Sequence, residues 1–526
     1  MSNTKSLRLA FLRLVVVSLV CCFVSVAGLA QTYPYVETKT PYAPQQNVST
    51  YEPPPPGFAP VFTQLVTRHG SRGLSSPKND LITYNMWADA KAKGQLTDLG
   101  QQIGNDMLQV IQANTILGCG VPGISNPGYG NLTLIGISEL TQLAQRMAPR
   151  VAPLLQNAVM DNRQVIVSTS GVDRAIDSSY FFTQSLANTV PGLGPLIVLS
   201  APLTKYPVND PMAQPPGVNR FDLYFHKLNA KTDLPAPDDP YYQTYQWSLA
   251  YQNFLATDPT MLAKVNGILY NDQTDALARN ILLASFTPAF VDALANGKTS
   301  YSNTGTYTFG SYDGKCTNTI KGDGKTKVAN LFDAANNVYA VYQIVPGMND
   351  ELPGLDMGKY FPGNGQLYTL EYLANAVDFY QAGPSITEEA PITWAMSQSL
   401  LDDFFAEGDA IANGNYAHAA KLRFSHAEII MPFAAKLGLP NASKTLPVDQ
   451  TYTYDNDPWR GAKIAPYTAN IQWDMYSNGK TLLVKMYYNE KETDFPAACD
   501  AARYLGGRTA RTHYYTYSGL KACYGY

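Results

Sequence analysis

Residues 61–73 have the sequence VFTQLVTRHGSRG. The first six are mostly apolar and follow a proline, a pattern that favours a short buried strand. A polar loop comes next, in which His69 stands between Arg68 and Arg72. Because open α/β sheets place their sites just beyond the carboxyl ends of strands, we expect this loop to belong to a functional site.

Further strands and helices are predicted downstream of this loop. Residues 164–168, QVIVS, favour a second strand, which is followed by a polar turn and a helix through Phe182. Two stretches with the pattern G-x-L-T-x-x-G place Thr97 and Thr133 where each can cap the start of an amphipathic helix. Other short apolar runs predict strands at residues 196–199, 422–424 and 481–487. This alternation predicts an α/β fold with one sheet between layers of helices.

The middle of the chain has a different character. Stretches rich in Ala, Leu and Tyr, such as residues 245–255 and 274–294, favour helices, and a Tyr/Thr/Gly patch at 300–312 is the main strand signal near them. We therefore assign residues 218–347 to a helical cap inserted into the α/β domain. The α/β domain then comprises residues 61–217 and 348–526.

The first thirty residues resemble an export signal. Lys5, Arg8 and Arg13 precede an apolar run at residues 14–27, which is followed by Gly-Leu-Ala. A membrane span is the alternative, but it needs about 20 apolar residues and the run is shorter. We therefore predict a signal peptide over residues 1–30, export to the periplasm or the cell exterior, and no membrane anchor after cleavage.

Residues 31–60 form the next segment. They are rich in Pro and Tyr and include four consecutive prolines at 53–56. Such a sequence cannot form a helix or a central strand. We expect an extended leader that lies over the surface of the protein.

The composition excludes one class of partner. Charged residues make up 15% of the chain, against about 25% in an average soluble protein. The formal net charge is −4, and it becomes −7 without residues 1–30, which carry three basic residues and no acidic one. A low and negative charge argues against nucleic acid as a partner.

Four cysteines lie outside the predicted signal peptide: Cys119, Cys316, Cys499 and Cys523. An even number in an oxidising compartment indicates two disulfides, although four cysteines allow three pairings. Cys499 and Cys523 would close a short loop and are the preferred pair. Cys119 and Cys316 remain, either as a second disulfide or as buried free thiols.

The residue types around His69 indicate an anion site. Guanidinium groups match the oxygens of a phosphoryl group, and clustering them without an anion is costly. Arg174 follows the second predicted strand at the start of a helix, where an anion is also favoured. If the anion is a phosphate ester, the His69 imidazole can attack phosphorus and form a phosphohistidine.

A second histidine motif occurs at residues 423–428, RFSHAE. His426 can help the arginines to hold the phosphate oxygens, and Glu428 is a candidate general acid for the leaving group. A protonated Glu428 beside an unprotonated His69 predicts an acidic to near-neutral pH optimum. We expect no metal and no cofactor, because the two histidines lack metal-ligand spacing and arginines would repel a cation.

Taken together, these segments resemble a known family. Residues 68–72 match the R-H-G-x-R signature of the histidine phosphatase superfamily, and residues 132–136 and 168–178 are similar to its acid phosphatase and phytase branch. The His-Ala-Glu at 426–428 is typical of the multiple inositol polyphosphate phosphatases, whereas most of the branch has His-Asp there.

The resemblance implies a mixed sheet with helices on both faces, as in phosphoglycerate mutase-like folds, and a helical domain over the cleft. It implies that His69 is the nucleophile and Glu428 the proton donor, with a phosphate clamp of Arg68, Arg72, Arg174 and His426. The implied substrates are phytate, other inositol phosphates and 2,3-bisphosphoglycerate. A broad-specificity acid phosphatase and a non-catalytic relative that binds a phosphorylated ligand remain the alternatives.

The chain departs from the family in the loop after the signature. An aromatic residue and a proline usually follow, whereas residues 73–77 here are GLSSP. The contact that this loop makes to a second substrate phosphate is therefore in question, and Lys78 is a candidate to supply it. Arg220 and Lys227, at the start of the insertion, are further candidates, with solvated surface residues as the alternative.

Overall fold

The computed structural model describes residues 35–203, 206, 210, 212–311, 313–507 and 511–526. Residues 35–526 form one compact unit. The predicted signal peptide, residues 1–30, lies outside the described residues.

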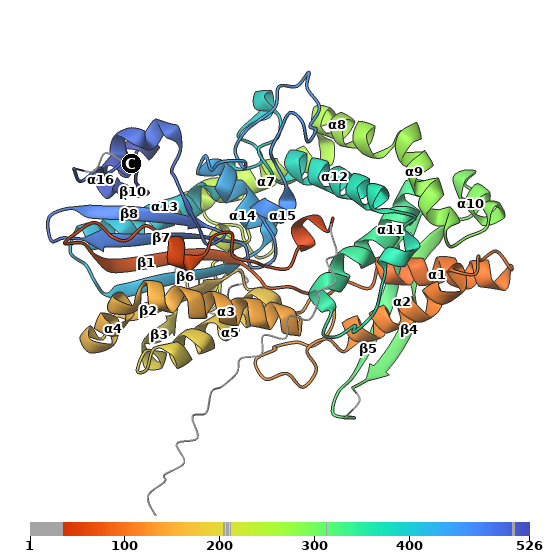
Figure 1. The fold of residues 1–526 in the computed structure, drawn as a ribbon, viewed down its shortest axis with the longest axis horizontal. Helices are drawn as coiled ribbons and strands as arrows, with labels where there is room; N and C mark the ends of the chain where they lie inside the picture. Colours follow the sequence, from red (N-terminus) through yellow and green to blue (C-terminus); the bar gives the residue numbers. More distant parts are fainter. Residues whose placement is uncertain (1–34, 204–205, 207–209, 211, 312, 508–510) are drawn as a thin grey trace, which may run out of the picture. The chain divides into compact units, whose positions relative to one another are not determined.

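An eight-stranded mixed sheet lies at the centre of the α/β part (Figure 1), in the order β10-β8-β7-β1-β6-β2-β3, with β9 paired to β8. The central strand β1 runs parallel to β6 and antiparallel to β7, and it is buried along most of its length. The strands are β1 (Ala59–Arg68), β2 (Gln164–Thr169), β3 (Ile197–Leu199), β6 (His418–Ser425), β7 (Asn470–Ser477), β8 (Leu482–Tyr488), β9 (Lys491–Thr493) and β10 (Tyr514–Thr516).

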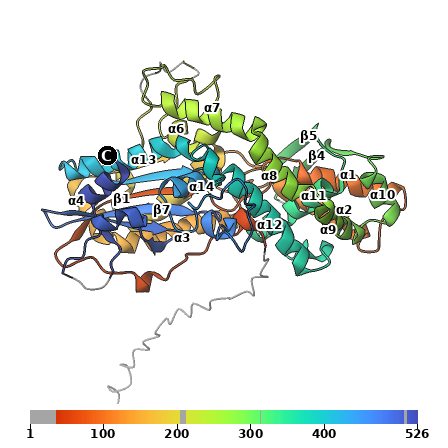
Figure 2. The same cartoon turned by 90° about the horizontal axis from the view of Figure 1, so that it is seen from above.

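Helices cover both faces of this sheet, as predicted. Phe62 and Val66 of β1 belong to one apolar core and Leu65 to another, because successive side chains of a strand point to opposite faces. Figure 2 shows α13 and α3 on opposite sides of β1. One layer contains α3 (Leu134–Arg150), α4 (Ala152–Asp161) and α5 (Asp173–Thr189), and the other contains α13 (Gln398–Ala412) and α14 (Ala427–Lys436).

The threonine caps lie where the sequence predicts them. The Thr133 side chain accepts a hydrogen bond from Gly136 N at the start of α3 (3.0 Å), and Thr97 does the same for Gly100 N at the start of α2 (Gly100–Thr115; 3.0 Å). Each bond satisfies a backbone donor that has no partner inside its helix.

The second group of elements is mostly helical. It contains α1 (Asn79–Ala92), α2 (Gly100–Thr115), α7 (Tyr242–Thr257), α8 (Pro259–Leu269), α9 (Asp272–Leu283), α10 (Pro288–Ala295), α11 (Leu331–Ile344) and α12 (Asn364–Gln381). It also contains the hairpin of β4 (Tyr301–Gly310) and β5 (Thr317–Val328), whose second strand is not predicted from the sequence. Short helices elsewhere are α6 (Arg220–Leu223), α15 (Gly461–Ile464) and α16 (Tyr517–Tyr524).

Two details of this group differ from the expected helical insertion. The stretch 274–294 is divided between α9 and α10, and Pro288 begins the second helix, where its missing N–H costs nothing. Helices α1 and α2, which precede residue 218, lie beside the β4–β5 hairpin (Figure 1). The boundaries of the cap at residues 218 and 347 stay a prediction.

The segment before β1 is not entirely on the surface. It carries two turns of 3-10 helix, η1 (Glu37–Lys39) and η2 (Val48–Thr50), and Val36, Glu37 and Thr38 are buried. The extended surface leader predicted for residues 31–60 therefore fails for these three residues. Interior residues bond to them: Arg68 Nη1 donates to Thr38 O (2.5 Å), and Glu37 N donates to Glu371 Oε1 (3.1 Å).

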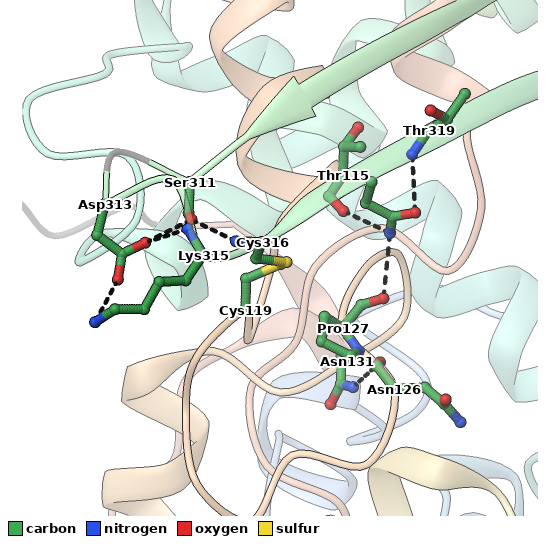
Figure 3. Close-up of a disulfide and its surroundings, with 11 residues drawn as sticks. Thr115, Cys119, Asn126, Pro127, Asn131, Ser311, Asp313, Lys315, Cys316 and Thr319 are labelled. Atoms are coloured by element: carbon green, nitrogen blue, oxygen red, sulfur yellow. Dashed lines mark hydrogen bonds and ion pairs between the residues drawn. A yellow bond between two sulfur atoms is a disulfide. The ribbon is translucent and has the colours of Figure 1, made fainter.

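Both disulfides are present. Cys499 pairs with Cys523, as predicted, with Cα atoms 5.4 Å apart. Cys119 pairs with Cys316 (Cα–Cα 5.9 Å), which decides the alternative that the sequence leaves open (Figure 3). In the described part of the chain, no helix is long and apolar enough to cross a membrane.

Candidate active site

The candidate site lies at the carboxyl ends of three adjacent parallel strands, β1, β6 and β2. His69 follows β1, His426 follows β6, and Arg174 lies in the first turn of α5 after β2. Backbone bonds join these strand ends, since His69 N donates to Ser425 O (3.0 Å) and Ser170 N donates to Phe424 O (3.1 Å). The sheet therefore brings together loops that lie hundreds of residues apart.

A cavity of about 250 Å³ opens at this edge. Of the predicted residues, Arg68, His69, Arg72, Arg174, Lys227 and Glu428 line it. The His426 ring lies beside the His69 ring, with 5.4 Å between their centroids. The other residues that line the cavity are Thr38, Lys39, His226, Tyr251, Leu255, Asp378, Gln381, Ala382, Ala427 and Met431.

His69 is held as a neutral imidazole with one nitrogen free. Its Nδ1 lies 2.9 Å from Gly70 O, and because a carbonyl can only accept, Nδ1 carries the proton. The Nε2 atom then keeps its lone pair. Burial, and then the cations Arg174 and Arg68, lower the pKa of His69 well below its usual range. The imidazole is therefore neutral, with a lone pair on Nε2.

Close packing of two glycines sets the position of this loop. A Cβ atom on Gly70 would lie 2.4 Å from Gly136 O, and one on Gly136 would lie 2.1 Å from Ser71 O. Both approaches are shorter than van der Waals contact with backbone atoms. The loop that carries His69 can therefore rest on the start of α3 only without side chains at these two positions.

The three arginines form a cluster in which some hydrogen-bond donors have no acceptor. Arg68, Arg72 and Arg174 each have a buried Nε with no hydrogen-bond partner, and none forms an ion pair within the described residues. Burial, and then the charge of Arg72, lower the pKa of Arg174 to about 10. Glu428 and Glu37 act on these cations only from a distance, and desolvated guanidinium groups without a hydrogen-bonded counter-charge are costly, so the cluster is suited to hold an anion.

His426 contributes to the candidate anion site from the end of β6. Its Nε2 lies 2.8 Å from Ser170 Oγ, and its buried Nδ1 has no partner among the described residues. Burial, and then Arg174, lower the pKa of His426 well below its usual range. The Ser170 contact is a feature that the sequence analysis does not identify, although Ser170 directly follows the predicted second strand.

Glu428 lies in the first turn of α14 and is the carboxylate nearest to the histidines. Burial alone would raise its pKa, but His226 and His426 outweigh burial and hold the pKa of the Glu428 carboxyl well below its usual range. Glu428 is therefore ionised while the cavity holds no anion.

The three candidates for further phosphate contacts lie in different places. Lys227 lines the cavity and is exposed at its mouth. Arg220 pairs with Asp233 (2.6 Å) and stacks on Tyr224, 4.6 Å from the ring centroid, so it does not line this cavity. Lys78 is exposed before α1 and does not line the cavity either.

Three lining residues are not identified from the sequence as functional: Lys39, His226 and Asp378. His226 immediately precedes Lys227, which is a usable signal. Lys39 and Asp378 are contributed by the N-terminal segment and α12, and no local motif marks them. Among the residues that the structure describes, no group of three or more His, Cys, Asp or Glu side chains is arranged to hold a metal ion.

Comparisons with known proteins agree with this geometry. The multiple inositol polyphosphate phosphatase of Bifidobacterium longum is 29% identical to this chain, and the superposition covers 93% of this chain and 97% of that one. The TM-score is 0.79 for its complex with inositol hexasulfate and 0.80 for its complex with phosphate. The phytase from D. castellii shares the fold at 13% identity, with a TM-score of 0.57 and coverage of 94% and 84%. No curated protein sequence matches the chain.

A family model for the histidine phosphatase superfamily (branch 2) matches residues 61–489. The match begins at β1 and includes the loops of His69, Arg174 and Glu428, so it contains every strand end that forms the cavity. This protein therefore belongs to branch 2 of the histidine phosphatase superfamily, among the histidine acid phosphatases.

Proposed function

We propose that the protein is an exported phosphomonoesterase that hydrolyses inositol polyphosphates, phytate among them. The 29% identical relative is named for that substrate class and was crystallised with inositol hexasulfate. The His-Ala-Glu sequence at residues 426–428, which resembles that of the multiple inositol polyphosphate phosphatases, also supports the assignment. For export, the support is the signal-like sequence at residues 1–30 together with two disulfides.

One observation carries the proposal. A neutral His69 shares a cavity with three guanidinium groups, and the buried Nε atoms of these groups have no partner in the described protein. A phosphate ester would supply both the missing acceptors and the electrophile. Few other ligands match both features.

The reaction follows in two displacements. His69 Nε2 attacks phosphorus, the P–O bond to the inositol oxygen breaks, and that oxygen takes a proton from Glu428. Arg68, Arg72 and Arg174, with His426, hold the equatorial oxygens as charge develops. Water then attacks the phosphohistidine and gives its proton to Glu428, the P–Nε2 bond breaks, and phosphate leaves.

The proton on Glu428 must arrive with the substrate, because the carboxyl is ionised in the empty cavity. The negative charge of a bound phosphate raises the pKa of Glu428 by repulsion, and the singly protonated form of the ester brings a proton of its own. Activity should therefore fall as the pH rises and the ester loses that proton. This gives the acidic to near-neutral optimum expected from the sequence.

Incubation of the purified protein with phytate, with the products separated by position isomer, tests the proposal. Release of phosphate with a defined series of lower inositol phosphates is expected. A His69→Ala variant that releases phosphate as fast as the wild type would contradict the enzyme assignment and favour a non-catalytic binding protein.

A broad-specificity acid phosphatase is the second candidate. It is favoured by the positions of Lys78 and Arg220, neither of which lines the cavity as a second phosphate contact would require. The ratio of kcat/KM for phytate to that for an aryl monophosphate separates the two. A ratio well below one would favour the second candidate.

A further inference from the structure

We propose that Lys39, in the segment before β1, is a substrate-binding residue that holds a second phosphate group of a polyphosphorylated ester. The inference rests on the proposed function for the identity of the ester. It adds a residue from outside both the family signature and the sheet, and it makes the N-terminal segment a part of the substrate pocket.

The backbone beneath Lys39 is fixed from several directions. Thr38 O accepts from Arg68 Nη1 (2.5 Å), so the segment is joined directly to the arginine beside the nucleophile. Glu37 N donates to Glu371 Oε1 on α12 (3.1 Å), and Tyr467 N donates to Thr40 O (3.0 Å). Lys39 is therefore presented by a preorganised support, which lowers the entropic cost of binding.

The ammonium group of Lys39 has hydrogen-bond donors that no acceptor within the described residues uses. The Lys39 side chain is half-buried and lines the catalytic cavity, and its Nζ donates one hydrogen bond, to Thr38 Oγ1 (3.1 Å). An ammonium group has three donors, and Lys39 forms no ion pair within the described residues. Three carboxyl groups share the lining of the two cavities with Lys39: Asp378, Glu37 and Glu428. Burial and then Glu37 raise the pKa of Asp378 well above its usual range, and none of these three described residues forms an ion pair with Lys39.

Lys39 also stands where two cavities meet. A second cavity, of about 270 Å³, is lined by Lys39 and Asp378 as well, together with residues of α11 and α12. On this proposal, the part of the substrate beyond the phosphate at His69 lies toward Lys39, where the linings of the two cavities share residues. An ester with one phosphate would have no group to place there.

The positions of the cations that line the catalytic cavity support a role for Lys39 in substrate binding. Arg68, Arg72 and Arg174 suffice for the reacting phosphate, which leaves Lys39 and Lys227 as cations without a role in the chemistry. Lysine binds phosphate as a point charge, which suits a rim contact that must tolerate different phosphate positions. Both lysines end short 3-10 helices, Lys39 in η1 and Lys227 in η4 (Phe225–Lys227).

Calorimetric titration with two probes tests the proposal. Inorganic phosphate occupies the His69 end only, whereas inositol hexasulfate also reaches the rim and is not hydrolysed. We expect Lys39→Gln to raise the Kd for inositol hexasulfate about tenfold, the value of one charged hydrogen bond, and to change the Kd for phosphate less than about twofold. Lys39→Arg, which keeps the charge, should restore most of the affinity for the hexasulfate.

Lys231→Gln is the matched control, because Lys231 is exposed nearby but does not line the cavity. It should change neither Kd by more than about twofold, as for other exposed charges. Equal weakening of both probes by Lys39→Gln, or no change in either, would overturn the proposal. Phytate hydrolysis by the wild type is measured separately, so a wild type inactive on phytate would refute the proposed substrate and leave the binding result interpretable.

Discussion

At the deep end of the cavity, His69 and Arg174 follow parallel strands in the middle of the sheet, whereas at the rim Lys39 and Lys227 stand on short 3-10 helices outside it. The deep residues are held by ladder bonds between neighbouring strands and by glycine packing. The segment that carries Lys39 is held by separate bonds to Arg68, Glu371 and Tyr467, and not by a strand ladder. Under the proposed function, the chemistry depends on residues that the sheet positions, and the choice of substrate depends on residues outside the sheet.

The largest effect is expected at the deep end. Replacing His69 by Ala removes the nucleophile and should lower kcat by at least about 1,000-fold for phytate and for an aryl phosphate alike. Steady-state phosphate release measures this effect. Acid-labile labelling of the protein by a ³²P-phosphate ester should be lost in parallel, and labelling that persists in the variant would place the nucleophile elsewhere.

Arg174→Ala should have the next largest effect. It removes a buried cation that faces the reacting phosphate, so kcat/KM should fall about 100-fold to 1,000-fold for both substrates, as when a transition-state donor is lost. Arg163→Ala is a suitable control, because Arg163 directly precedes β2 and donates to the backbone carbonyls of Tyr416 and His418 at the start of β6, away from the cavity. A loss confined to phytate would show that Arg174 contacts another phosphate group of the substrate and not the reacting one.

Glu428→Gln should separate the two substrates by their leaving groups. The inositol oxygen needs a proton, so kcat on phytate should fall about 100-fold, whereas an aryl phosphate with a good leaving group should lose less than about tenfold. The wild-type rate on phytate should decline as the pH rises and Glu428 in the complex loses its proton. The variant should lack that alkaline decline, and a variant with full activity on phytate would exclude Glu428 as the donor.

Lys227→Gln should have the smallest effect, because the side chain is exposed at the mouth of the cavity. We expect kcat/KM for phytate to fall about threefold at low salt, and less at about 0.5 M salt, where exposed charges are screened. The aryl phosphate should be unaffected. A salt-independent loss on both substrates would show that Lys227 acts at the deep end instead.

The features that the sequence predicts are local ones, and those that it does not predict depend mostly on contacts across the fold. The strand before His69, the second strand at 164–168 and the threonine caps are predicted because hydrophobic periodicity and capping are local properties. Strand β5 is missed because Ile320 and Val328 are its only apolar side chains, and the other positions between its exposed residues are Asn, Gly and Thr, so it lacks an apolar face that would mark it. The break at Pro288 is also missed, although proline at the start of a helix is a local signal.

The amino-acid sequence by itself determined the α/β class, the chemistry of residues 68–72 and 426–428, and the preferred pairing of Cys499 with Cys523, because each depends on residues close together in the chain. Only the tertiary structure decided that Arg220 pairs with Asp233, that Cys119 bonds Cys316, and that Lys39 reaches the catalytic cavity. Cys119 and Cys316 lie 197 residues apart, and Lys39 and His69 are brought to one cavity by packing across the fold, so no spacing in the sequence encodes these contacts. Arg220 and Asp233 are only 13 residues apart, but no local motif marks them as partners. For an anion site in a chain of low charge, the position of a few cations is a property of the fold.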